Sequence, residues 1–307
     1  MSNKRLFLLV VAAAAALVAC TTADKRQRTH YETDIHPDAV IAVKHDSPVE
    51  ILRVASLNIA HGRNDSVNQL LVSADRFREN LDEVARVLDE YRPHVVALQE
   101  ADAESRWSGS FDHLAYLATA AGYPWRVHEL SAQSWLFSFG TALLSVLPVM
   151  ETVTHTFDAS PPTLDKGFVL AQIDWASDDG TTTRKVDILS VHLDFSRKSV
   201  RQEQIAEMVD ILSSRNNPTI IMGDFNSEWL AKETVIKQLA QTSHFKTYMP
   251  ESDDYNTYKN KRLDWILISN DMEFVGYRVL PDALSDHAVI LADIRFRKSV
   301  DSKLNRL

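Results

Sequence analysis

The hydrophobic pattern of this chain consists of short apolar runs that stop abruptly at polar residues. Residues 219–222, Thr-Ile-Ile-Met, end at Gly223, and Asp224 and Asn226 follow closely. A β-rich run of this length predicts a buried strand. Because residues i and i+2 of a strand point to the same side, Asp224 and Asn226 would face one pocket together. The alternative is a turn, in which Gly, Asp and Asn are common.

The same pattern recurs at five further runs, which we interpret as strands with polar ends. These runs cover residues 54–58, 95–100, 186–193, 263–268 and 285–290, and they carry Asn58, Glu100, His192, Asp264 and the pair Asp286 and His287. One polar strand end has many explanations, whereas six suggest convergence on one site. An anion beside an amide donor suits hydrolysis at phosphorus, because one can activate a nucleophile while the other holds a phosphate oxygen.

Two amphipathic helices separate pairs of these strands. Apolar residues at helical spacing mark them: Phe77, Leu81, Val84, Leu88 and Tyr91 in the first, and Ile205, Met208, Val209 and Leu212 in the second. Pro93 closes the first helix. Each helix leads into a predicted strand, so both halves of the chain show the order strand, helix, strand. The pattern therefore predicts an α/β or α+β domain whose polar strand ends meet.

The first residues are typical of a targeting segment rather than of a folded domain. A short basic stretch precedes the apolar residues 6–17, which are too few for a comfortable membrane span. Residues 17–20, Leu-Val-Ala-Cys, then resemble a bacterial lipobox. We expect residues 1–19 to be a lipoprotein signal peptide and Cys20 to be lipidated. The alternative is an ordinary cleaved secretory signal with an incidental cysteine.

The remaining chain divides into a tether, one large domain and a short tail. Residues 20–48 mix charges with prolines and show little periodicity, which is typical of a flexible tether. Residues 49–298 suit one domain with a substantial core, and residues 299–307 form a tail. Thr21 stands where lipoproteins retained in the inner membrane usually have Asp, so we expect an exported protein anchored to a bacterial membrane, with the outer membrane favoured.

The composition narrows the choice of partners. Cys20 is the only cysteine, so an intrachain disulfide is excluded. The formal charge of −9 would become more negative after loss of Lys4 and Arg5 with the signal. Such a surface disfavours nucleic acid unless a local basic patch overrides it. The nearest candidate, residues 196–201, carries only Arg197, Lys198 and Arg201. No obligate protein partner is inferred.

The polar strand ends, taken in order, resemble the endonuclease/exonuclease/phosphatase superfamily with its DNase I-like fold. The residues that carry the resemblance are Leu57-Asn58, Gln99-Glu100, Gly140-Thr141, His192-Leu193, Gly223-Asp224-Phe225-Asn226, Arg262-Leu263-Asp264-Trp265 and Ser285-Asp286-His287. The resemblance covers roughly residues 50–297 and implies a four-layer αββα sandwich of two packed, mixed β-sheets flanked by helices. The series is specific for the superfamily and poor at choosing a substrate.

The resemblance also implies a divalent metal bound by Asn58, Glu100 and Asp286. All three residues offer hard oxygen atoms, which favours Mg²⁺ or Mn²⁺ over Zn²⁺. Mg²⁺ keeps several waters and needs only one or two carboxylates, so a sparse protein site is expected.

Five further residues receive catalytic roles by the same resemblance. Asp264 and His287 would form a pair in which the carboxylate orients the imidazole. Asp224 would orient or deprotonate the attacking water, Asn226 would donate to a phosphate oxygen, and His192 would stabilise charge or protonate the leaving group. Whether Asp224 or His287 takes the proton stays open.

Three weaker candidates for substrate binding remain, together with alternatives. His61 follows the first motif and could line the cleft. Lys166 could face negative charge on the substrate or could equally be a solvated lysine at a strand start. Arg262 is the third candidate.

These features predict a metal-dependent phosphoesterase that hydrolyses a phosphodiester or phosphomonoester outside the cytoplasm, with a lipid-like or small organic substrate favoured. A membrane-anchored, Mg²⁺-dependent nuclease and a non-catalytic binding lipoprotein on the same scaffold are the alternatives. The first motif lacks the acid that DNA-repair members often carry two residues after Asn58. The position of His192 directly before Leu193 resembles the sphingomyelinase, inositol-phosphatase and DNase I branches of the superfamily. Both points argue against an abasic-site endonuclease.

Overall fold

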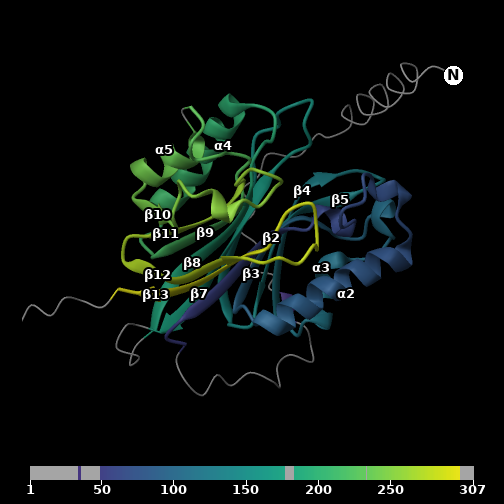
Figure 1. Ribbon diagram of the computed structural model, residues 1–307, viewed down its shortest axis with the longest axis horizontal. Coiled ribbons are helices and arrows are strands. Elements are labelled where there is room, and N and C mark those ends of the chain that lie inside the picture. Colours follow the sequence, from purple (N-terminus) through teal and green to yellow (C-terminus); the bar gives the residue numbers. More distant parts are fainter. Residues whose placement is uncertain (1–33, 36–48, 177–182, 233, 298–307) are drawn as a thin grey trace, which may run out of the picture.

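Two β-sheets pack face to face at the centre of the molecule, and the helices cover their outer faces (Figure 1). The computed structural model describes residues 34–35, 49–176, 183–232 and 234–297. The predicted four-layer arrangement of two mixed sheets with flanking helices is therefore confirmed. The predicted signal peptide, the lipidated Cys20 and the tail at 299–307 lie outside the described residues.

The first sheet has seven strands in the order β1-β4-β5-β3-β2-β13-β12. Its strands are β1 (Asp34–Ile35), β2 (Leu52–Asn58), β3 (Val95–Asp102), β4 (Trp125–Gln133), β5 (Ser138–Ser145), β12 (Met272–Val279) and β13 (Ile290–Phe296). Only β2 and β3 are parallel neighbours, with Asn58 opposite Gln99. Strand β1 lies within the predicted tether and pairs with the start of β4, so this part of the tether is not free of structure.

The second sheet has six strands in the order β10-β11-β9-β8-β7-β6. Its strands are β6 (Val149–Thr156), β7 (Gly167–Ala176), β8 (Thr183–His192), β9 (Thr219–Asp224), β10 (Phe245–Thr247) and β11 (Asp264–Ser269). Strands β8 and β9 are the parallel pair, and their neighbours are antiparallel. Each sheet thus contains one parallel pair at its centre, which brings the carboxyl ends of two strands to the same edge.

The two predicted amphipathic helices are the crossovers that make these parallel pairs possible. They are α2 (Ala74–Tyr91) and α4 (Lys198–Ser213); the other described helices are α3 (His113–Ala120), α5 (Val235–Thr242), η3 (Ala60–Gly62), η4 (Gln69–Leu71), η5 (Arg106–Ser108) and η6 (Asp253–Tyr255). Helix α2 begins where the Ser73 hydroxyl accepts from the Arg76 amide, and it ends at Arg92 in the left-handed region, just before Pro93.

Apolar side chains form three layers of core that match the predicted faces. The central layer lies between the sheets and joins Val54 and Ala97 of the first sheet to Ile188 and Ile220 of the second. One outer layer packs α2 and α3 on the first sheet, and the other packs α4 and α5 on the second. Within the described residues, no helix is both long and apolar enough to cross a membrane.

One predicted strand differs from the structure. The run 285–290 was expected to be a strand beginning with its acid–imidazole pair, but β13 begins only at Ile290. Asp286 and His287 lie in the loop before it. The loop frees His287 from the alternation of a strand and allows its side chain to reach across to the other sheet.

Candidate active site

A row of three polar residues crosses the second sheet at the end of its central strands. Strand pairing sets His192 of β8 opposite Asp224 of β9, and Asp224 opposite Asp264 of β11. All three side chains are buried. Backbone hydrogen bonds fix this register, so the sheet itself positions the row.

Gly223 explains how Asp224 reaches this position. Its φ is +144°, and a Cβ atom added here would lie only 2.0 Å from the carbonyl oxygen of Val191 on the neighbouring strand. Any larger residue would therefore push β9 away from β8. The glycine that ends the apolar run in the sequence is a requirement of close strand approach.

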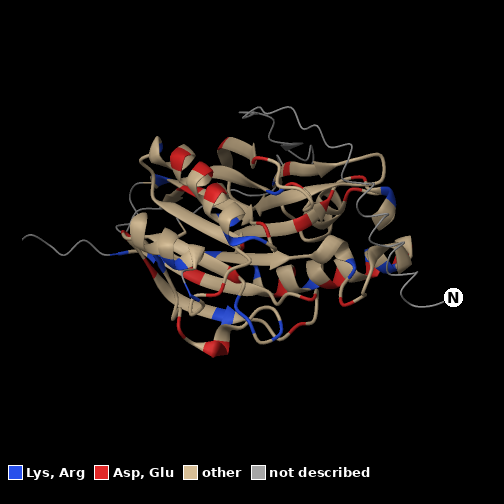
Figure 2. Cartoon of the chain, turned by 90° about the horizontal axis from the view of Figure 1, so that it is seen from above, with Lys and Arg blue, Asp and Glu red and all other residues tan. Residues whose placement is uncertain are grey.

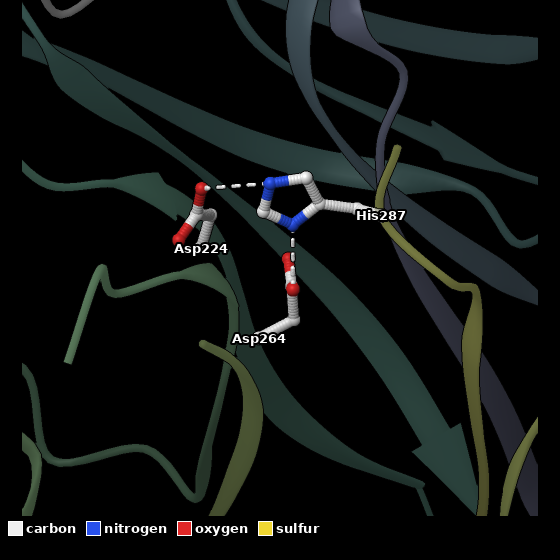
Figure 3. A group of neighbouring side chains, drawn as sticks. All are labelled: Asp224, Asp264 and His287. Carbon is white, nitrogen blue, oxygen red and sulfur yellow. Dashed lines mark hydrogen bonds and ion pairs between the residues drawn. The ribbon is translucent and has the colours of Figure 1, made fainter. Parts of the chain in front are cut away.

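Asp264, His287 and Asp224 form a chain of side chains (Figure 3). His287 Nδ1 lies 2.8 Å from Asp264 Oδ2, and His287 Nε2 lies 3.9 Å from Asp224 Oδ2. The Thr257 hydroxyl also donates to Asp264 Oδ2, and the ring of Tyr258 packs against the imidazole at 4.8 Å. The predicted Asp264–His287 pair is therefore formed, with Nε2 directed toward Asp224.

The protonation of this chain follows from burial and charge. Burial raises the pKa of Asp224 to about 7, and the negative charge of Asp264 adds to the effect. Burial alone would lower the pKa of His287, but Asp264 and Asp224 outweigh it and raise that pKa to about 10. Near neutral pH, a cationic imidazole thus faces a carboxyl group that can readily gain or lose a proton.

Asn58 connects the first sheet to Asp224. Its Nδ2 donates to Asp224 Oδ2 at 3.2 Å, and its Oδ1 accepts from the Ala60 amide at 3.0 Å. The predicted meeting of strand ends from the two halves of the chain is visible in this contact.

Asn226 does not share the side of Asp224 in the way that strand alternation predicted. It lies beyond the end of β9, with a φ of +48°. Its backbone amide donates to Asp224 Oδ1 at 2.9 Å, and its side-chain Nδ2 donates to the Leu193 carbonyl at 3.0 Å. The turn that was the alternative interpretation is thus present just after the strand. Asn226 holds Asp224 through its backbone.

Glu100 sits in an irregular position of β3. The pairing with β5 shifts register between Gln99 and Ala101, and Glu100 has a φ of +52°. A bulge of this kind redirects a side chain out of strand alternation and is common beside active sites. About 22% of the Glu100 side chain stays exposed among otherwise buried neighbours.

Three nitrogen-bearing side chains surround the Glu100 carboxylate. Oε2 lies 3.4 Å from His61 Nε2, whereas Oε1 lies 3.9 Å from Lys166 Nζ and 4.0 Å from His192 Nε2. Burial would raise the pKa of Glu100, but His61, Lys166 and His192 outweigh it and lower the pKa to about 2. Glu100 is therefore a permanent anion at neutral pH.

Lys166 and His192 lie together on one side of this carboxylate. Lys166 is only 8% exposed, and its Nζ lies 3.3 Å from His192 Nδ1. The alternative of a solvated lysine at a strand start is therefore wrong. Burial and the Lys166 charge keep the pKa of His192 well below its usual value, while His192 Nε2 lies 3.5 Å from Asp224 Oδ2.

Asp286 and Arg262 have neighbours that the sequence did not predict. Asp286 Oδ2 pairs with Arg63 Nη2 at 2.7 Å, and the charge of Asp286 also acts on His287. Arg262 is 5% exposed and stacks its guanidinium 4.1 Å from the ring centre of Trp265, while its Nη1 donates to the Tyr248 carbonyl. Arg262 is thus held by contacts within the protein.

Sequence reasoning missed Asp102 and Thr257. Asp102 is fully buried at the end of β3, where it contacts His61 and Trp107. Its position two residues after Glu100 was the signal available. Thr257 has no comparable signal, because it meets Asp264 through a loop turn.

Two sets of residues could bind a divalent metal. Among the described residues, ligand atoms of Asp224, Asp264 and His287 lie within 4.8 Å of one another. A cation inside that group would compete with the His287–Asp264 bond. Glu100 is ionised and partly exposed, and Asn58 adds a carbonyl oxygen, so these hard oxygen donors fit Mg²⁺ or Mn²⁺ better. We therefore favour Glu100 and Asn58.

A comparison of the sequence with known families agrees with this geometry. The profile of the Endonuclease/Exonuclease/phosphatase family matches residues 55–287, which include strands of both sheets and the entire cluster. The chain belongs to this family. Members are generally hydrolases that act on phosphoester bonds, and they typically use divalent metals. A search of curated protein sequences found no match.

Several solved structures share the fold. A family member from Beutenbergia cavernae has a TM-score of 0.65 at 18% identity, with 81% of this chain and 72% of that one covered. The catalytic domain of human nocturnin has a TM-score of 0.57 at 18% identity, covering 83% and 96%. Beta toxin of Staphylococcus aureus has a TM-score of 0.54 at 19% identity, covering 78% and 99%. At these identities the likeness shows the fold alone.

Proposed function

We propose that this protein is a metal-dependent phosphoesterase that acts outside the cytoplasm on a lipid-like or small organic phosphoester. One observation carries the proposal: His192 Nε2 lies 3.5 Å from Asp224 of the Asp264–His287–Asp224 chain and 4.0 Å from the anion Glu100 of the other sheet. This arrangement combines a group that can exchange a proton at neutral pH, cations at His287 and Lys166 that can bind an oxyanion, and a carboxylate that can bind a metal ion.

In this proposal Asp224 acts on the attacking water and His287 acts on the phosphate. Asp224, with a pKa of about 7, accepts the proton of the attacking water. His287 stays protonated, because Asp264 holds its Nδ1, and its Nε2–H stabilises charge that develops on a phosphoryl oxygen. Asn58 and the Asn226 backbone amide fix the Asp224 carboxylate, which limits the reorganisation needed on reaction.

Lys166 and His192, which both lie near Glu100 Oε1, would bind the substrate in this proposal. The ammonium of Lys166 attracts a negatively charged substrate, and the low pKa of His192 leaves that imidazole neutral and able to donate or accept one hydrogen bond. Asn226 retains a second amide hydrogen beyond the one given to Leu193, and that hydrogen is available to a phosphate oxygen.

A divalent cation, for which we propose Mg²⁺ or Mn²⁺, would be held by Glu100 and Asn58 and would polarise a phosphoryl oxygen as a Lewis acid. The family typically uses such metals, and the lowered pKa of Glu100 keeps its carboxylate ready for a cation at any physiological pH.

The substrate preference rests on charge and on location. The formal charge of −9 disfavours a long polyanion, and Figure 2 shows basic segments interleaved with acidic ones. The structure of the nocturnin catalytic domain has a bound sulfate anion, which supports oxyanion binding by this fold. A lipid anchor at Cys20 would bring the candidate site close to phospholipid headgroups.

The test uses the full-length protein, purified in detergent and freed of metal. We expect turnover of one class among bis-p-nitrophenyl phosphate, sphingomyelin, phosphatidylinositol derivatives, inositol phosphates and plasmid DNA, only with Mg²⁺ or Mn²⁺. Asp224→Asn and His287→Ala should each reduce it at least about 100-fold, whereas His155→Ala should not, because the His155 side chain pairs with Glu207 at 2.8 Å. Unchanged turnover in both site variants would refute the assignment, and preferential cleavage of DNA would establish the nuclease.

The proposed location has its own test. Cys20→Ala should leave the protein unlipidated, so that it no longer fractionates with membranes. Release of the wild-type protein in soluble form would refute the anchor and leave the catalytic proposal intact.

A further inference from the structure

His61 lies between two carboxylates of the same strand. Its Nε2 is 3.4 Å from Glu100 Oε2, and its Nδ1 is 3.3 Å from Asp102 Oδ1. Both acids belong to the end of β3, where the bulge at Glu100 turns that side chain toward the imidazole. A single histidine thus uses both ring nitrogens to connect Asp102 to Glu100.

The surroundings fix the imidazole itself. His61 lies in η3 with a φ of +58°, and its side chain is only 11% exposed. The ring meets Phe139 edge-on at 4.6 Å and Trp107 at 5.0 Å, so aromatic walls limit its rotation. Trp107 Nε1 also donates to Asp102 Oδ2 at 3.2 Å, and Asp102 is fully buried.

The two oxygens of Glu100 therefore have different neighbours. Oε2 faces His61, whereas Oε1 faces Lys166 and His192. A carboxylate on a strained bulge could rotate about its last bonds unless one oxygen were held. The contact with His61 provides that restraint and leaves Oε1 directed to the side where the proposed reaction occurs.

We propose that His61 is a positioning residue that fixes the Glu100 carboxylate, and that Asp102 and Trp107 fix His61 in turn. This role replaces the weak assignment of His61 to substrate binding. The inference rests on the proposed function only in taking Glu100 as a metal ligand. Groups that orient a metal ligand typically change metal affinity about 10- to 100-fold when they are removed.

The experiment measures the affinity of the full-length, metal-free protein for Mn²⁺ alone, by calorimetry and by the electron paramagnetic resonance signal of free Mn²⁺. We expect Glu100→Gln to abolish most binding, and His61→Ala and Asp102→Asn each to weaken it about 10- to 100-fold. The double variant should be no weaker than His61→Ala, because both residues act through one contact. His61→Gln should recover part of the affinity, since its amide can donate to Glu100.

His155→Ala is the matched control, because it also removes a partly buried imidazole paired with a carboxylate. It should bind Mn²⁺ as the wild type does, and circular dichroism melting should show all variants folded. If His61→Ala does not fold, His61→Gln and Asp102→Asn carry the test.

Three results would overturn the inference: Mn²⁺ affinity within twofold of wild type in the His61 and Asp102 variants, multiplied effects in the double variant, or Mn²⁺ binding that Glu100→Gln does not weaken. A protein that binds Mn²⁺ through Glu100 with the predicted dependence on His61, but hydrolyses no phosphoester, would instead refute the proposed function and leave the positioning role standing.

Discussion

Two histidines of this protein each lie between two carboxylates, and they do so differently. His287 is 2.8 Å from Asp264 but 3.9 Å from Asp224, whereas His61 is 3.3 Å from Asp102 and 3.4 Å from Glu100. The first arrangement joins two strands of one sheet to a loop. The second joins the end of a single strand to the short helix after β2.

The two distances are unequal around His287 and nearly equal around His61, and we call these the uneven and the even arrangement. The two arrangements suit different roles for a histidine between two carboxylates. In the uneven arrangement, Asp264 takes one nitrogen of His287, and the other nitrogen is left with a long contact that a phosphoryl oxygen can replace. In the even arrangement, both nitrogens of His61 are engaged, so the imidazole can hold a neighbour but has no nitrogen left for a substrate. This reasoning supports the catalytic role proposed for His287 and the positioning role proposed for His61.

The largest predicted effect comes from breaking the 2.8 Å contact between His287 and Asp264. Asp264→Asn would leave His287 without its anionic partner, and we expect kcat to fall about 10³- to 10⁴-fold, as when a carboxylate that orients a catalytic histidine is removed. Mn²⁺ affinity should stay within about threefold of wild type, because Glu100 is untouched. A fall in kcat smaller than tenfold would show that the uneven arrangement is structural.

Asp224→Asn tests the 3.9 Å contact between His287 and Asp224 through the pH dependence of kcat/KM. Asp224 must be ionised to accept a proton, so wild-type kcat/KM should rise as the pH approaches about 7 and fall again as His287 loses its proton near 10. A bound cation would shift both limbs to lower pH. The variant should lose about 10²- to 10⁴-fold in rate together with the acidic limb. Persistence of that limb would assign it to another group.

Glu129 sharpens the comparison, because it is a buried carboxyl group with hydroxyl neighbours instead of a histidine. The Thr156 hydroxyl donates to it at 2.7 Å, and burial raises its pKa to about 8, in contrast to about 2 for Glu100. A raised folded-state pKa gives stability that is present below the unfolded value and lost as the pH rises through about 8.

Glu129→Gln should remove this loss. Between pH 4.5 and 9 its free energy of unfolding should gain on the wild type by roughly 4 kcal/mol, measured by urea titration at both pH values. Parallel curves for the two proteins would mean that folding does not raise the pKa of Glu129.

The smallest predicted effect concerns the hydrogen bond from Trp107 to Asp102, which lies next to His61. Trp107→Phe keeps an aromatic ring beside His61 but removes the donor to Asp102. Loss of one hydrogen bond should weaken Mn²⁺ binding about 2- to 10-fold, less than the loss of His61. An effect as large as that of His61→Ala would place the main restraint in Trp107.

The sequence predicts the parts of the site that repeat a local rule. The apolar run before Gly223 predicts β9, and helical spacing predicts α2 and α4, because burial of one face leaves a periodic trace. The Asp264–His287 pair was found through the resemblance to a family, since residues 23 positions apart carry no local signal of contact.

The remaining parts depend on contacts between the sheets or on loop geometry. Burial of Lys166 follows from the packing of two sheets, and Asp286 meets Arg63 from a distant loop, so neither is visible in a local pattern. Asn226 obeys turn geometry where strand alternation was assumed. The bulge at Glu100 likewise leaves no clear sequence signature.

The hydrogen bond from Asn58 to Asp224 has a consequence for how activity and folding are linked. It joins residues 166 positions apart and connects one sheet to the other. Neither half of the chain alone contains a complete site, so a folding intermediate with one finished sheet would be inactive. Loss of activity on heating should therefore coincide with separation of the two sheets, which makes turnover a reporter of cooperative unfolding across the central core.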